Sequence, residues 1–101
     1  MEEIKARVRA MEDILNEQRA CQEKLKENLE KLRALNEDFL HLKNYYGSDD
    51  MEEDLRADEE GALEDIARGV LTQDSVYELI GDRYCLALEM LACAELIFKE
   101  Y

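Results

Sequence analysis

The chain has 101 residues, enough for one domain with a modest hydrophobic core. It contains four glycines, no proline and no tryptophan, and 39% of its residues are charged, a composition that favours helix. The net charge of −13 argues against nucleic acid or an anionic membrane as a partner, because phosphate groups would be repelled.

The negative charge is concentrated in the second half of the chain. Residues 1–48 hold ten acids and nine bases, a net charge of −1, whereas residues 49–101 hold sixteen acids and four bases, a net charge of −12. An acidic surface is a common means of keeping a protein soluble. It also permits binding to a basic protein.

Residues 3–46 carry apolar side chains at alternating spacings of three and four, which predicts a helix. No glycine or proline precedes Gly47, so we expect one helix over residues 1–46, about 60 Å long at 1.5 Å per residue. A helix of this length needs a partner surface to be stable. The apolar positions of the repeat are Ile4, Val8, Met11, Leu15, Leu25, Leu29, Leu32, Phe39 and Tyr46.

The width of this apolar stripe changes along the helix. After Leu25 the flanking positions include Leu35 and Leu42, and a wide stripe is typical of one wall of a helical bundle. The first half is narrower and is predicted to be a seam for a homodimer or for a helical protein partner. The seam residues are Ile4, Val8, Met11 and Leu15.

The sequence Asn44-Tyr45-Tyr46-Gly47-Ser48 predicts a tight turn between two helices. Glycine is favoured just past a helix end, and a serine hydroxyl can cap the next helix. The acids that follow Ser48 would lie in the first turns of that helix, where the helix dipole favours carboxylates. The two tyrosines either form a recognition corner or cover the end of a core with their hydroxyls in water.

The remainder of the chain predicts three or four shorter helices that fold back on the C-terminal half of the long helix. Residues 49–60 form the first, with Met51 and Leu55 as its apolar contacts, and Gly61 ends it. Leu63, Ile66 and Ala67 then give one or two helical turns, which Gly69 closes.

Two helices are expected after this segment. Thr72 is expected to cap helix 73–80, which Gly81 ends. Asp82 is expected to cap the last helix, 83–100, which is apolar nearly all round and therefore belongs in a bundle or an oligomer interface.

The residues that most often carry catalytic or metal-binding chemistry are few in this chain and are not clustered. The single histidine, His41, and the cysteines Cys21, Cys85 and Cys93 show no paired ligand spacing, so we expect no metal, no cofactor and reduced thiols. No nucleophile with a positioned base is recognisable, and we predict that the protein is not an enzyme. The N-terminus lacks a signal peptide, which together with the thiols predicts a cytoplasmic protein.

From Tyr45 to about Leu91 the chain resembles a family of small bacterial proteins catalogued as a domain of unknown function. The matching residues are Tyr45-Tyr46-Gly47-Ser48, Asp54, Asp58, Gly61, Arg68-Gly69-Val70-Leu71-Thr72, Asp74 and Val76-Tyr77-Glu78-Leu79. The resemblance implies a bacterial, cytoplasmic, all-helical protein, and it implies no activity, substrate or cofactor. If members of the family share a site, its matching polar residues would be Tyr45, Tyr46, Asp54 and Asp58.

Two functions stay open from the residues. One is a protein–protein interaction or dimerisation module that uses the seam of the long helix. The other is an acidic inhibitor, or nucleic-acid mimic, that presents the ten carboxylates of residues 49–65 to a basic protein. Salt would weaken the second kind of binding steeply, because it screens charge attraction at a surface.

Overall fold

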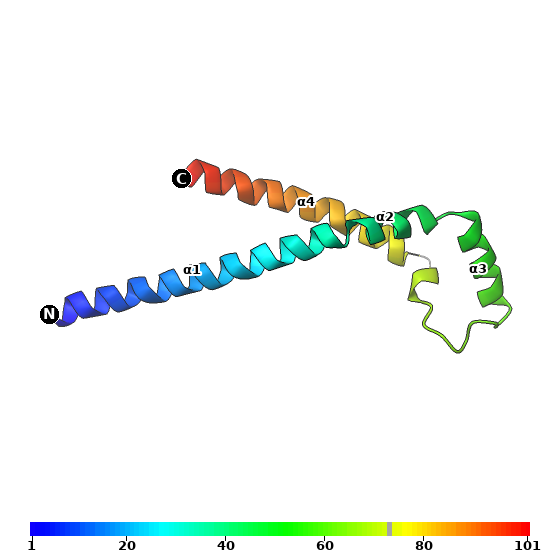
Figure 1. Cartoon of the computed structure of the whole chain (residues 1–101), viewed down its shortest axis with the longest axis horizontal. Coiled ribbons are helices and arrows are strands. Elements are labelled where there is room, and N and C mark those ends of the chain that lie inside the picture. Colours follow the sequence, from blue (N-terminus) through cyan, green and yellow to red (C-terminus); the bar gives the residue numbers. More distant parts are fainter. Residues whose placement is uncertain (73) are drawn as a thin grey trace. The chain divides into compact units, whose positions relative to one another are not determined.

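The computed structural model describes residues 1–72 and 74–101, and these residues form an all-α protein, as predicted. In chain order the elements are α1 (Glu2–Ala34), α2 (Asn36–Tyr45), α3 (Asp49–Glu59), the 3-10 helix η1 (Gly69–Leu71) and α4 (Ser75–Glu100) (Figure 1). The chain divides into two compact units, Met1–Asp38 and Phe39–Tyr101. The prediction of a single domain over residues 1–101 stays a prediction.

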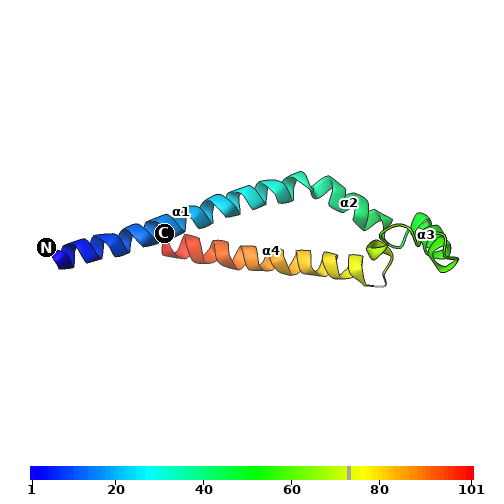
Figure 2. The same ribbon diagram turned by 90° about the horizontal axis from the view of Figure 1, so that it is seen from below.

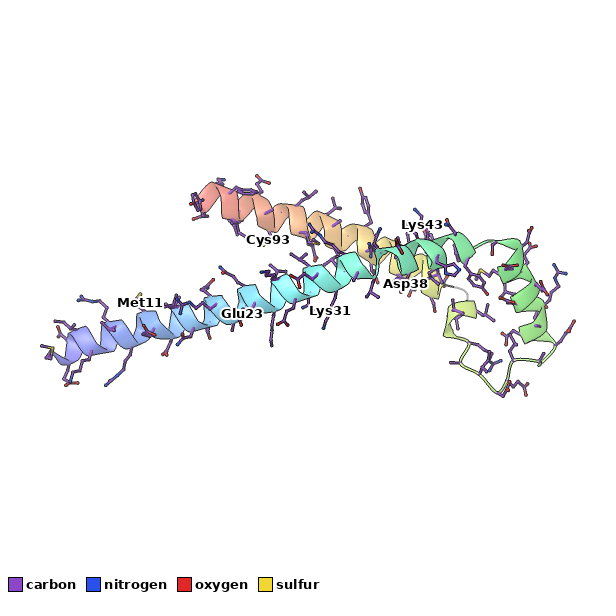
Figure 3. All side chains as sticks on the ribbon, in the orientation of Figure 1. Met11, Glu23, Lys31, Asp38, Lys43 and Cys93 are labelled. Atoms are coloured by element: carbon purple, nitrogen blue, oxygen red, sulfur yellow. The ribbon has the colours of Figure 1, made fainter. Side chains whose placement is uncertain are left out.

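The first unit is dominated by α1, a helix of 33 residues with no buried side chain. Its side chains project from the helix on all sides, with Met11, Glu23 and Lys31 labelled in Figure 3. Acids stand in its first turn and bases in its last turn, as the helix dipole favours. A single helix has no interior of its own, so this unit cannot bury its apolar stripe.

The prediction of one uninterrupted helix over residues 1–46 is wrong at Leu35. This residue has φ −88° and ψ 2°, outside helical values, and its N–H still bonds to the Lys31 carbonyl at 3.0 Å. Asn36, Glu37 and Asp38 follow: asparagine and aspartate favour the start of a helix over its interior, and the helix dipole favours both acids near the start rather than the end. The apolar repeat continues past this point, which is why periodicity alone did not reveal the interruption.

In the second unit, α2, α3, η1 and α4 contact one another through a small number of side chains. The guanidinium of Arg83 on α4 lies over the Phe39 ring of α2, 4.0 Å from its centroid, and η1 contacts both α3 and α4. Met51 and Val76 are the buried hydrophobic residues of the described chain, 7% and 3% exposed. Figure 2 shows α3 and η1 near the start of α4. The predicted folding back of α4 is therefore found at Phe39 of α2. Packing of α4 against residues 25–38 stays a prediction.

Gly61 ends α3 as predicted, through a Schellman motif. Its φ is +78°, its N–H bonds to the Asp58 carbonyl at 3.0 Å, and the N–H of Ala62 bonds to the Ala57 carbonyl at 3.0 Å. The helical segment expected around Leu63 is not a helix but a series of hydrogen-bonded turns. The stretch is too short for its hydrogen bonds to offset the free-energy cost of nucleating a helix. Gly69 begins η1 and does not close a helix.

The two helices expected in the C-terminal region are one helix, α4. It runs through Gly81 and Asp82, so Gly81 is not a terminator and Asp82 is not a cap. Glycine inside a helix costs about 1 kcal/mol relative to alanine, and the helix-forming residues on both sides offset that cost. The helix is preceded by Asp74, not by Thr72, and Gln73 of the predicted helix 73–80 lies outside the described residues.

Most apolar side chains of α4 are exposed to solvent, among them Tyr84 (67%), Leu91 (69%) and Phe98 (81%). Cys21, Cys85 and Cys93 are free and exposed, and His41 is an exposed residue of α2. Figure 3 labels Cys93 on α4. Of the helices in the described part of the chain, none combines the length and the apolar character needed to cross a bilayer.

Candidate functional site: the corner between α2 and α3

The candidate site is the α2–α3 corner, which we define as residues 45–54. Ser48 closes the turn, because its N–H and its hydroxyl both donate to the Tyr45 carbonyl, at 3.0 and 2.6 Å. Gly47 has φ +77°, a conformation that glycine adopts without the cost imposed by a side chain. The predicted tight turn at this sequence is therefore confirmed.

Ser48 is also the N-cap of α3, as predicted. Its hydroxyl oxygen accepts a hydrogen bond from the Met51 N–H at 3.2 Å. The same hydroxyl thus donates to the end of α2 and accepts from the start of α3. Asp49, Asp50 and Glu52 occupy the first turn of α3, where the positive end of the helix dipole favours carboxylates.

Tyr45 and Asp54, two of the predicted site residues, are brought into direct contact. The Tyr45 hydroxyl donates to Asp54 Oδ2 at 2.6 Å, which joins the last turn of α2 to the middle of α3. Accepting this bond, Asp54 stabilises the neutral phenol and raises the pKa of Tyr45 to about 12, with smaller contributions from burial and from the negative charges of Asp54 and Asp50. Both side chains are half-buried.

Asp58, the third predicted residue, pairs with a residue that the site prediction did not include. Arg68 Nη1 donates to Asp58 Oδ1 at 2.7 Å and fastens the loop after α3 to that helix. Arg68 is one of only four bases among residues 49–101, and a base in so acidic a region is a signal for an ion pair. Its partner could not be read from helical spacing, because an irregular loop separates the two residues.

Tyr46, the fourth predicted residue, is 37% exposed and faces an open hollow of about 450 Å³. The lining residues of this hollow are Tyr46, Gly47, Met51, Leu55, Leu71 and Thr72. A second hollow of about 550 Å³ adjoins it and shares Leu71 and Thr72. The remaining lining residues of the second hollow are Asp58, Ile66, Ala67, Arg68 and Gly69.

The four predicted site residues therefore fall in one region, yet three of them are engaged in bonds that hold the chain together. Tyr45 is bonded to Asp54, and Asp58 is paired with Arg68. Among the residues that the structure describes, no three of His, Cys, Asp or Glu are grouped so as to hold a metal ion. The polar side chains of this region therefore make structural hydrogen bonds, and they do so beside a hollow with a mainly apolar lining.

The seam residues of α1 lie in the other unit and all are exposed. The exposed fractions are 48% for Ile4, 55% for Val8, 56% for Met11 and 41% for Leu15. Consecutive seam residues are three or four positions apart, so they share one face of α1.

The Tyr45–Asp54 bond predicts a pH dependence of stability at high pH. Because the folded pKa of Tyr45 is about 12 and the ordinary value is 10.0, the bond stabilises the fold fully below pH 10 and is lost as the pH rises through 12. We expect the unfolding free energy to fall by about 1 kcal/mol over this range, because solvent reduces the effect at a half-buried pair. The measurement is urea unfolding of wild type and Tyr45→Phe at each pH, since phenylalanine cannot ionise.

The control for this prediction is Asp54→Asn, which removes the charged acceptor. We expect the pKa of Tyr45, followed by NMR of its ζ carbon, to move from about 12 toward 10.0 in this variant. An unchanged Tyr45 pKa in Asp54→Asn would contradict the assignment of the hydrogen bond as the main cause.

Comparison with protein-family models matches residues 8–93 to a family described as a domain of unknown function, DUF4298. The match runs from the second turn of α1 into α4 and includes the whole of the α2–α3 corner. Searches of curated proteins and of solved structures gave no match. Because the matched segment covers most of the chain, this protein belongs to the DUF4298 family.

Proposed function

We propose that this protein is a non-enzymatic interaction module that self-associates through the seam of α1. The observation that carries the proposal is the exposure of Ile4, Val8, Met11 and Leu15, each at least 41%, on one face of a helix that has no interior within its own unit. Such a stripe must be covered for a helix of this length to be stable in water. Alternating spacings of three and four are the pattern by which helices pair.

The charge distribution favours a second copy of the chain as the cover. Residues 1–48 carry a net charge of −1, so two α1 helices can approach without strong repulsion. Residues 49–101 carry −12 and would repel each other in the same encounter. Pairing through the N-terminal segment therefore brings together the parts of two identical chains that have the smaller net charge.

The engagement of the polar side chains at the α2–α3 corner supports a role other than catalysis. A general acid or base needs an ionisable group within hydrogen-bond reach of a substrate. At the corner the carboxylate of Asp54 already accepts a hydrogen bond from Tyr45, and further along α3 the carboxylate of Asp58 accepts one from Arg68. The proposed role of Asp54 is to fix the angle between α2 and α3, and that of Asp58 is to hold the loop after α3, while α1 makes the contact with the second copy.

The test is sedimentation equilibrium of the full chain over a range of protein concentrations, at low and at high salt. We expect a dimer that persists or tightens at high salt, because apolar contacts are insensitive to screening whereas repulsion between the acidic halves is screened. A chain that stays monomeric at every concentration would overturn the proposal. So would a dimer that salt dissociates.

A further inference from the structure

The hollow beside the α2–α3 corner, which we name the anchor socket, has an apolar lining that the fold does not fill. Its volume is about 450 Å³, within the range of pockets that take small ligands or single anchoring side chains. The apolar side chains of its lining are those of Tyr46 at the turn, Met51 and Leu55 on α3, and Leu71 on η1. Three consecutive elements of the second unit thus converge on one surface depression.

The floor of the anchor socket is held in place by the corner. Met51 is 7% exposed, and its sulfur accepts a hydrogen bond from the Gly47 N–H at 3.3 Å. A Cβ built on Gly47 would meet nothing within 4 Å, so the space above the turn is open. The socket is therefore preformed and accessible, with a soft thioether at its base that can adapt to different apolar groups.

The surroundings of the anchor socket are strongly acidic. Helix α3, which supplies Met51 and Leu55, has seven acidic residues and one base, Arg56, and therefore a net charge of −6. At 100° per residue, Glu52 and Glu59 both lie along one edge of the face that carries Met51 and Leu55, and both are exposed, with Glu52 Oε2 3.9 Å from Arg56 Nη2. An occupant of the socket would thus meet carboxylates along one edge of the apolar lining.

From this combination we propose that the anchor socket binds a large apolar side chain presented by a lysine- or arginine-rich segment of another protein. The apolar side chain would supply contact area as a buried anchor, as such residues do in protein interfaces. The basic neighbours would pair with the carboxylates of α3 and speed the encounter. This surface is separate from the α1 seam, and the inference does not depend on self-association.

The probe is a set of three synthetic 12-residue peptides, added to the full ¹⁵N-labelled chain at low salt. One has a lysine-rich frame with a central phenylalanine, the second has alanine at that centre, and the third keeps phenylalanine in a glutamate-rich frame. We expect the first peptide to shift the amide signals of Tyr46, Leu55 and Leu71. The alanine peptide should bind at least about tenfold more weakly, and the glutamate peptide should not bind.

A matched pair of variants separates the socket from the general acidity of α3. Leu71→Gln places an amide in the socket wall and should weaken binding of the phenylalanine peptide at least about tenfold. Ile66→Gln, at a 58% exposed position of the adjoining hollow, should leave it unchanged. The proposal is overturned if no lysine-rich peptide binds, if the alanine peptide binds equally well, or if both variants behave alike.

Discussion

Replacing Met51 by alanine should lower the unfolding free energy of the second unit by about 2–4 kcal/mol, a typical cost for emptying a buried methionine site. Met51 is one of two buried hydrophobic residues in the described chain, at 7% exposure. Its sulfur also accepts the Gly47 N–H at 3.3 Å, so the substitution removes a partner at the turn. The free energy of unfolding of a small domain is only a few kcal/mol in total, so we expect this one substitution to unfold much of the unit.

The measurement is urea unfolding followed by circular dichroism at 222 nm, with Met51→Leu as the control. Leucine keeps nearly the same volume, so this variant should lose less than about 1.5 kcal/mol. The prediction would be wrong if Met51→Ala and Met51→Leu unfolded at the same urea concentration. Such a result would mean that the corner is held by its hydrogen bonds and not by packing at Met51.

The α2–α3 corner was predictable from sequence because its determinants are local. Gly47 takes the positive φ that ends one helix, and Ser48 caps the next, within five consecutive residues. The contact between Tyr45 and Asp54 follows from the same geometry, since the turn brings the end of α2 beside α3. Tyr45, Ser48 and Asp54 are among the residues on which the family resemblance rests, and the same residues make the hydrogen bonds that form the corner.

Predictions that relied on glycine alone as a stop signal were less successful. Gly47 and Gly61 have positive φ and end helices, whereas Gly81 lies inside α4. The difference is set by the flanking sequence, because residues on both sides of Gly81 continue a strong helical pattern. At Leu35 the error was the opposite, a helix end that was not predicted. The apolar repeat continues through this residue although the backbone leaves the helix there.

The anchor socket could not be derived from sequence, because part of its wall comes from an irregular segment. Leu71 lies on η1, and the path of residues 61–68 that carries it there follows no repeating pattern. The contact between Arg68 and Asp58 depends on the same irregular segment, since the two residues are ten positions apart in the chain. Helical spacing locates residues on one helix, and it says nothing about contacts made across a loop of this kind.

Substituting glutamine at both Val8 and Leu15 should raise the dissociation constant of the proposed dimer at least about a hundredfold. Burying one valine or leucine side chain contributes about 1.5–3 kcal/mol, and a symmetric dimer would lose two such side chains from each chain. Glutamine is a good helix former, so the two substitutions change the intrinsic helix propensity of α1 little and act mainly on the seam. Sedimentation equilibrium at high salt measures the change in the dissociation constant directly.

The matched control is the double variant Arg9→Gln and Asp13→Gln. Both residues are exposed and lie on the face of α1 opposite the seam, at 100° per residue, and their joint replacement leaves the net charge at −13. This control should dimerise like the wild type. Equal dissociation constants for the two double variants would place the contact elsewhere than on the seam. A wild-type monomer that the seam variant destabilises would show instead that the seam is covered within its own chain, which also contradicts the proposed dimer.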